Sequence, residues 1–475
     1  MKFTKILGFL KKRCLYILLG AVGLLFFYLF ILSKSAALIF NMAMAEQEML
    51  LGKITVEEIY GHISGKTTFT GLRWDNLEGE TILYVPEGVI GVKPFDILRG
   101  KFEADTIYKI ELKNARLFLN MDDNMNLDFV TKKENSEHRE EHKTDEVLAA
   151  GTEEERLRLS KLRRQKEAEE FAGEWRNFHH ENRDIHMEFN LEDCPVSVIY
   201  KGKHYYLSAV NVESEIDSNS FMKFKISTGR FGGNMRGGAI TIRGDIKWDD
   251  ENPEPIADMS ALFQDIDVAS LGIMDNQADS VTLEAYFYGP LANLEGDGVI
   301  KMDKLSLPNL PFTNVRGDFV YKEGLFTFKK LHANVFEGEL NASGDFHMDT
   351  RYYHIHGVAT NLSAKSALPK DKLTTKVDAN LHMVANENSR NMALWGDFVG
   401  SAGSYDGIPF DKVTANFTNS YRDLRFFNAR IDVGYYTLKS DFIGIKDGKL
   451  TLDPVILEDI RTGKERMRYV RDNNG

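Results

Sequence analysis

The stretch LTTKVDANLHM (residues 373–383) indicates the fold class, because apolar and polar residues alternate along it. In a β-strand, neighbouring side chains point to opposite faces, so every second residue shares a face. One face of this predicted strand holds Leu373, Thr375, Val377, Ala379, Leu381 and Met383. The other holds Thr374, Lys376, Asp378, Asn380 and His382. The stretch therefore predicts a strand with one apolar and one polar face.

The same alternation occurs in residues 240–248 and 281–287. A sheet of such strands must bury its apolar face, either against a second layer in a closed sandwich or in an apolar groove that holds lipid. No long amphipathic helix follows residue 190, and alternation alone leaves both alternatives open. The candidate groove residues are Ile240, Ile242, Ile246, Val281, Leu283, Phe287, Leu373, Val377, Leu381 and Met383.

Internal repeats extend this pattern over residues 191–455. Residues 234–249 (NMRGGAITIRGDIKWD) align without gaps on residues 334–349 (NVFEGELNASGDFHMD). Likewise LPFTNVRGDF (310–319) aligns on IPFDKVTANF (408–417). A repeat of just under 100 residues predicts one multi-strand unit that is used several times in a continuous sheet. Residues 456–475 follow as a polar tail.

The N-terminus predicts a membrane anchor. Residues 14–33 (CLYILLGAVGLLFFYLFILS) carry no charge and match the length of a bilayer-spanning helix. The basic residues before this run place residues 1–13 in the cytoplasm and the rest of the chain outside it. A cleaved signal peptide is the alternative, because Ala43-Met44-Ala45 resembles a cleavage site. An uncleaved, single-pass anchor is favoured because the apolar run is long.

Composition and motifs exclude several functional classes. The net charge is −12 with no basic stripe, which argues against nucleic acid. The stretch IYGHISGKTTFTGLRW (59–74) has only three residues between the glycines Gly61 and Gly65, and no helical pattern follows, so it is not a nucleotide-binding P-loop. No catalytic motif such as G-x-S-x-G or H-E-x-x-H occurs. The sequence therefore predicts no enzyme, metal or cofactor.

Residues 132–190 form a charged insertion. A helical pattern begins near Thr152, and its apolar face holds Phe171, Trp175 and Phe178. The insertion is either a solvated, charge-laced helix or flexible segment, or a helix that caps an open end of the β region or touches a partner. His179, His180 and His186 match no zinc spacing.

Four stretches resemble the AsmA/TamB-like family of membrane-anchored periplasmic proteins. Residues 37–58 have a helical pattern. The first stretch comes after the anchor and a short helix, and it reads ITVEEIYGHISGKTTFTGLRWDN (54–76). The next two, GVIGVKPFDILRGKFEADTIYKIELKNARLFLN (88–120) and MDDNMNLDFV (121–130), complete a mixed α/β domain over residues 37–131. The last is LSLPNLPFTNVRGDFVYKEGLFTFKKLHANVFEGELNASGDF (305–346). The likeness rests on the order and rhythm of these stretches.

The resemblance implies a mainly β protein: an elongated, curled, repetitive sheet with an apolar groove, anchored in the inner membrane by its N-terminal helix. It also implies a periplasmic role in carrying phospholipid toward the outer membrane and in envelope homeostasis. A scaffold that assists outer-membrane proteins through an exposed C-terminal strand edge is the alternative. Phospholipid acyl chains and the inner membrane are the expected partners, with an outer-membrane protein as a further partner in the alternative.

Overall fold

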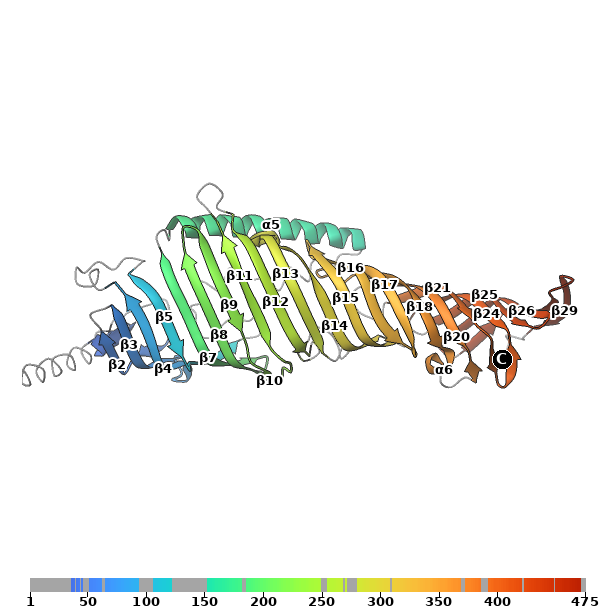
Figure 1. Ribbon diagram of the computed structural model, residues 1–475, viewed down its shortest axis with the longest axis horizontal. Helices are drawn as coiled ribbons and strands as arrows, with labels where there is room; N and C mark the ends of the chain where they lie inside the picture. Colours follow the sequence, from blue (N-terminus) through green and yellow to red (C-terminus); the bar gives the residue numbers. More distant parts are fainter. Residues whose placement is uncertain are drawn as a thin grey trace, which may run out of the picture. The chain divides into compact units, whose positions relative to one another are not determined.

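Figure 1 shows the computed structural model of the chain. The structure describes residues 36–38, 40–42, 44–45, 51–61, 65–93, 106–121, 152–181, 185–248, 254–267, 270, 280–307, 310–368, 372–385, 392–420, 423–447 and 449–470. The predicted anchor, residues 14–33, lies outside these ranges. Within the ranges, no helix is both long and apolar enough to cross a membrane. The described chain is mainly β, as the alternation predicts.

Backbone contacts divide the chain into two units. Unit 1 comprises residues 1–138, 178–235 and 247–251, and unit 2 comprises residues 139–177, 236–246 and 252–475. The strands of unit 1 are β1 (Lys53–Thr55), β2 (Glu58–Gly61), β3 (Lys66–Asp75), β4 (Thr81–Val92), β5 (Ile107–Lys113), β6 (Arg116–Met121), β7 (His186–Tyr200), β8 (Lys203–Asp217), β9 (Phe221–Ser227) and β10 (Phe231–Gly233). The strands pair in an antiparallel manner, except that β7 runs parallel to both β5 and β6. A parallel pair needs a long crossover connection, and residues 122–185 provide it.

The core of unit 1 lies on one face of these strands. Its buried residues are Ala37, Val56, Phe69, Val85, Ala115, Cys194 and Val196. Helical residues between 36 and 45 pack here, and Asn41 holds the adjoining chain through two hydrogen bonds to the Val56 backbone, of 3.0 and 2.8 Å. The prediction of helix over residues 37–58 is wrong from Lys53 onward, because Lys53–Thr55 pairs with β3.

Unit 2 is an antiparallel meander (Figure 1). Its main strands are β11 (Ile240–Lys247), β12 (Ile256–Ile266), β13 (Val281–Pro290), β14 (Glu295–Leu307), β15 (Leu310–Lys322), β16 (Leu325–Val335), β17 (Gly338–His347), β18 (Tyr353–Ser363), β20 (Lys376–Ala385), β21 (Ala393–Gly400), β24 (Lys412–Ser420), β25 (Asp423–Val433), β26 (Tyr436–Lys446), β27 (Lys449–Leu452), β28 (Val455–Asp459) and β29 (Lys464–Tyr469). A separate small sheet contains β19 (Leu373–Thr374), β22 (Gly403–Tyr405) and β23 (Ile408–Phe410).

Short turns connect most of these strands. Between β15 and β16, Glu323 and Gly324 have φ angles of 49° and 81°, the left-handed pair that a two-residue hairpin turn requires. Two short helices also interrupt unit 2: the 3₁₀ helix η1 (Leu291–Asn293) follows β13, and α6 (Ala364–Ala367) follows β18. Ser363 caps α6 by accepting a hydrogen bond from the Ser366 backbone amide. The short turns and the capped helix fix the pairing register between strands, and this register brings side chains of one kind onto one face of the sheet.

The charged insertion contains helix α5 (Glu153–Glu181), which begins one residue after Thr152. The Thr152 side chain caps it by accepting a 3.2 Å hydrogen bond from the Glu155 amide. Glu153, Glu154 and Glu155 occupy the first turn, where carboxylates favour the positive end of the helix dipole. The predicted helix is therefore confirmed.

Candidate functional site

The strand pairing of unit 2 aligns apolar residues into a continuous row. Successive partners across β13 to β26 are Leu283, Ile300, Gly317, Leu331, Ala342, Gly357, Leu381, Gly396, Phe417, Phe426 and Ile443. Partners in register share a face, so this row defines the apolar face of unit 2. Eleven strands spaced about 4.8 Å apart give the row a length of about 48 Å. The row has no charged member along this distance.

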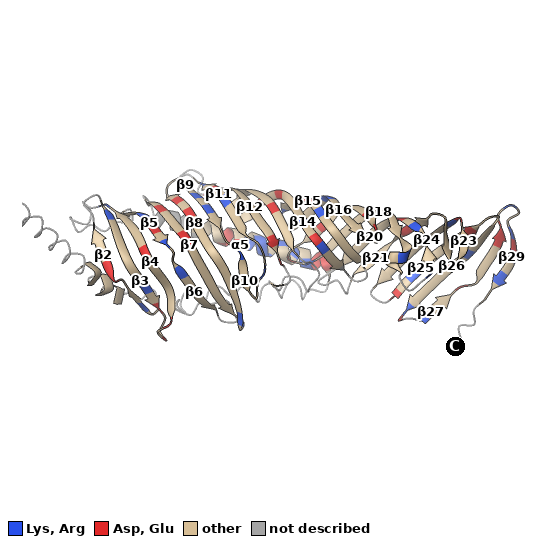
Figure 2. Cartoon of the chain, turned by 60° about the horizontal axis from the view of Figure 1, so that its bottom comes forward, with Lys and Arg blue, Asp and Glu red and all other residues tan. Residues whose placement is uncertain are grey.

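The opposite side of the same strands is the polar face. One register position away, the row reads Lys301, Arg316, His332, Asn341, Val358, Asn380, Asp397 and Asn416. Acidic and basic residues are interspersed over the strands in Figure 2. The sheet therefore carries apolar side chains on one face and polar side chains on the other, as the alternation of residues 373–383 predicts.

Nine of the ten candidate groove residues lie on the apolar face. The register places six of them there: Val281, Leu283, Phe287, Val377, Leu381 and Met383. In β11, Arg243 Nε donates a 3.1 Å hydrogen bond to Ser260 Oγ, and Ser260 belongs to the polar face. Alternation from Arg243 then assigns Ile240, Ile242 and Ile246 to the apolar face.

Leu373 is the exception. The prediction of one strand over residues 373–383 is wrong, because the chain leaves strand geometry at Thr375. Leu373 pairs with Tyr405 in the small sheet and does not belong to the main row. The Thr375 hydroxyl donates a 2.7 Å hydrogen bond to the Ser401 carbonyl, and this contact holds the chain at the break.

Most apolar-face candidates are half-buried, while Ile246 and Met383 are buried. Two clusters give the face its tightly packed parts. One centres on Phe312, Val315, Ala333, Val335, Leu340 and Ala359, and the other on Met383, Ala385, Met392 and Leu394. Leu381 packs against both clusters, and its two cross-strand neighbours, Gly357 and Gly396, have no side chains.

One end of the apolar face is aromatic, a feature that the sequence reasoning missed. Phe287, Phe319, Tyr321, Phe326, Phe328 and Phe346 contact one another, with ring centroids 4.9–6.4 Å apart. These rings lie near the β15–β16 and β17–β18 turns, whereas the opposite strand ends carry the cluster around Val315 and Val335. The sequence feature that indicates this aromatic end is the alternation of Phe326, Thr327 and Phe328.

Tyr353 adds a polar atom to this aromatic end. Its hydroxyl is buried and has no hydrogen-bond partner among the residues that the structure describes. Burial raises the pKa of Tyr353 to about 12, so the hydroxyl stays neutral and able to donate a hydrogen bond at physiological pH.

Helix α5 is attached to unit 2 through Asp349, in the turn between β17 and β18. Arg164 donates two hydrogen bonds to the Asp349 carboxylate, of 2.7 and 2.9 Å, and Arg163 Nη2 lies 2.8 Å from it. Ser160 also donates its hydroxyl to this carboxylate. Burial disfavours the charged form of Asp349, but the hydrogen bonds and the arginine charges hold its pKa below the ordinary value. We call this cluster the α5 latch.

The predicted cap residues of α5 are partly described. Phe171 and Trp175 are half-buried and stack with a centroid separation of 6.3 Å, as their spacing on one helix face allows. The side chain of Phe178 lies outside the described part of the chain, as do His179 and His180. No cluster of metal-ligating side chains occurs within the described ranges.

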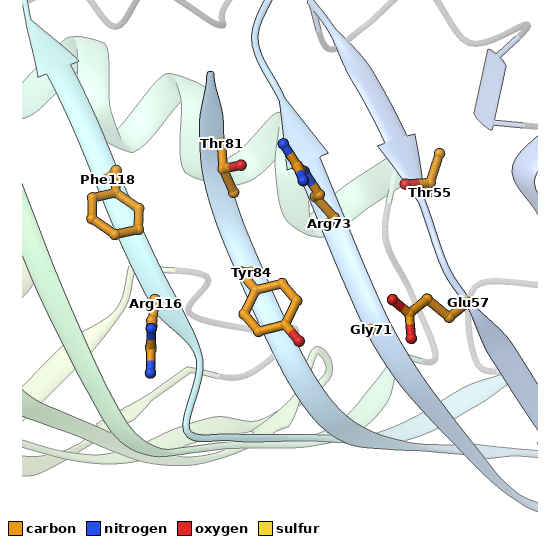
Figure 3. A pocket seen from close by; sticks show the side chains of 8 residues that line it. All are labelled: Thr55, Glu57, Gly71, Arg73, Thr81, Tyr84, Arg116 and Phe118. Atoms are coloured by element: carbon orange, nitrogen blue, oxygen red, sulfur yellow. The ribbon is translucent and has the colours of Figure 1, made fainter. Parts of the chain in front are cut away.

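Unit 1 carries a separate hollow of about 360 Å³. Figure 3 shows its lining, which consists of Thr55, Glu57, Gly71, Arg73, Thr81, Tyr84, Arg116 and Phe118. Its central row is the register Thr55, Arg73, Tyr84 and Arg116, on the face opposite the unit 1 core. Arg73 is already paired with Asp75 at 2.6 Å. The hollow is open, polar and of mixed charge.

Comparisons with protein-family models, curated proteins and solved structures give no match to this chain.

Proposed function

We propose that this chain is a membrane-anchored periplasmic protein of the AsmA/TamB-like type that carries phospholipid along an apolar groove. The proposed path leads from the inner toward the outer membrane and supports envelope homeostasis. The observation that carries the proposal is the uninterrupted apolar row of unit 2. A soluble protein rarely presents so long an apolar surface without a partner that covers it.

The energetics of acyl chains fit such a surface. Each methylene that leaves water for an apolar contact gains about 0.8 kcal/mol. Because every strand contributes an uncharged member to the row, an acyl chain can shift by one strand and still meet no charged residue. The binding free energy then varies little along the row, and this favours movement of the acyl chain over tight binding at one position. No reactive side chain is required, so the proposal assigns the chain a carrier role without catalysis.

Lipid that co-purifies with the full-length chain tests the proposal directly. The chain is extracted in a mild non-ionic detergent, and native mass spectrometry then measures phospholipid adducts. We expect adducts on the wild type and on Asn380→Arg, which alters the polar face. Leu381→Arg should carry few, since its charge interrupts the apolar row. Equal adducts on both variants would contradict the proposal.

A second candidate function is assembly of outer-membrane proteins through a strand edge. Strand β29 pairs with β28 on one side, and its side chains are exposed, including Met467 and Tyr469. Such an edge accepts an added strand from a partner. Removal of the residues after Leu452 should then abolish crosslinking to a protein partner and leave lipid adducts unchanged. Persistent partner crosslinks in this truncation would exclude the edge.

A further inference from the structure

Unit 2 contains a hollow whose lining comes mainly from polar-face residues, together with Gly317, Leu331, Ala342 and Gly357 of the apolar row. It measures about 580 Å³ and is lined by residues of β15, β16, β17 and β18. The pairing of β16 is irregular here, since its register with β17 shifts between Phe328 and Leu331. Such a bulge adds residues to one strand and changes the direction of their side chains. The irregular segment holds Lys329 and Lys330, and both line the hollow.

Positive charge exceeds negative charge in this lining. Arg316, Lys329 and Lys330 face a single carboxylate, Asp318, although the whole chain carries a net charge of −12. None of the three cations has an ion-pair partner in the described ranges. Other lysines of nearby strands do, as Lys301 pairs with Glu284 at 2.8 Å. An unneutralised group of cations is costly unless solvent or an anion balances it.

Neutral hydrogen-bonding groups lie beside the cations. His332 Nδ1 and Asn341 Oδ1 are 3.2 Å apart, and Ser343 Oγ lies 2.9 Å from His356 Nε2. These four side chains line the hollow. Their mutual hydrogen bonds hold the rings, the amide and the hydroxyl in place on three neighbouring strands. The hollow therefore combines exposed cations with positioned polar groups.

We infer that this hollow binds a phosphate-bearing ligand. Guanidinium and ammonium groups form short, charge-assisted hydrogen bonds to phosphate oxygens, and arginine can do so with two bonds at once. The hydroxyl of Ser343 and the amide of Asn341 supply further donors. The volume lies within the range of about 300–1,000 Å³ that is typical of small-molecule sites. The phosphate belongs either to a soluble compound or to a lipid headgroup.

Calorimetry on the full-length chain in non-ionic detergent tests this inference with inorganic pyrophosphate as the probe. The double variant Arg316→Gln/Lys330→Gln should bind pyrophosphate at least tenfold more weakly than the wild type. The matched control is Arg430→Gln/Lys304→Gln. It removes one arginine and one lysine that are also exposed and without an ion-pair partner in the described ranges. This control should retain the wild-type affinity.

A parallel titration with dioctanoyl phosphatidic acid in the same detergent distinguishes the two phosphate sources. Pyrophosphate binding that the Arg316/Lys330 variant loses supports a soluble ligand. Binding of phosphatidic acid alone, again lost in that variant, supports the inference and assigns the headgroup source. Because Arg316 and Lys330 lie on the polar face, Leu381→Arg should leave pyrophosphate binding intact. Equal affinities in both double variants, or no binding of either probe, would overturn the inference.

Discussion

A charge at Leu381 should block lipid movement while the chain still folds. Leu381 lies in the middle of the apolar row, between Gly357 and Gly396, and its side chain is half-buried. A hydrated guanidinium there would displace about three methylenes from apolar contact, at about 0.8 kcal/mol each. The resulting barrier of about 2.4 kcal/mol corresponds to roughly 60-fold slower passage.

A fluorescence-based transfer assay measures this effect. The full-length chain is reconstituted in donor vesicles that contain a labelled phospholipid, and the rate of its arrival in acceptor vesicles is recorded. Asn380→Arg is the matched control, because it places the same charge one residue away on the polar face. It should transfer lipid at the wild-type rate. Thermal unfolding of both variants checks that each is folded.

Transfer by folded Leu381→Arg at the wild-type rate would refute the reasoning. Equal slowing by both arginine variants would refute it as well, because the effect would then not depend on the face of the sheet.

Three further predictions concern the contacts that hold the fold. Asp349→Asn should weaken the α5 latch by about 3 kcal/mol and speed amide hydrogen exchange in residues 153–175 roughly 150-fold. Unchanged amide exchange in these residues would contradict this prediction. Asn41→Ala removes two hydrogen bonds to Val56 and should lower the free energy of unfolding of unit 1 by about 1–2 kcal/mol in a denaturant titration. Hydrogen bonds from Arg461 and Arg466 hold the pKa of Asp459 well below its ordinary value. The ionised Asp459 side chain therefore contributes its full stabilisation above the unfolded pKa of about 3.9, and this stabilisation is lost as pH falls through the folded pKa. Amide hydrogen exchange in residues 455–469 should accordingly become faster in acid in the wild type. In Asp459→Asn this acceleration in acid should be absent.

The faces of the sheet could be predicted from the sequence because strand periodicity is local. Alternation assigned Val377 and Leu381 to one face without knowledge of their partners, and the pairing register agrees. The repeats also fall on corresponding structure, since residues 234–249 contain β11 and residues 334–349 contain β17. A two-residue period fixes orientation once strand geometry is given.

Breaks and long-range contacts could not be predicted in this way. Leu373 continues the alternating pattern, yet a hydrogen bond from the Ala364 amide to the Thr375 carbonyl, 3.1 Å long, accompanies the change of sheet. Helix α5 was predicted from its own residues, but its latch joins Arg164 to Asp349, which is 185 positions away in the sequence. Contacts of this kind depend on the whole topology, and no local pattern specifies them.

The helix that was predicted over residues 37–58 shows the same limit. Local pattern favoured continuation of the helix, whereas Lys53–Thr55 gains backbone hydrogen bonds by pairing with Arg73–Asp75. Tertiary pairing overrides a weak helix preference in so short a segment. The aromatic end of the apolar face likewise became visible only when register brought Phe319 beside Phe328.

Photocrosslinking inside cells tests the central claim most directly. A photoreactive amino acid replaces Leu381 on the apolar face or Asn380 on the polar face, and mass spectrometry identifies what each captures after irradiation. We expect phospholipid attached at position 381 and little or none at position 380. Crosslinks from position 381 that join only other parts of the same chain would contradict it, because the apolar face would then be a closed protein core.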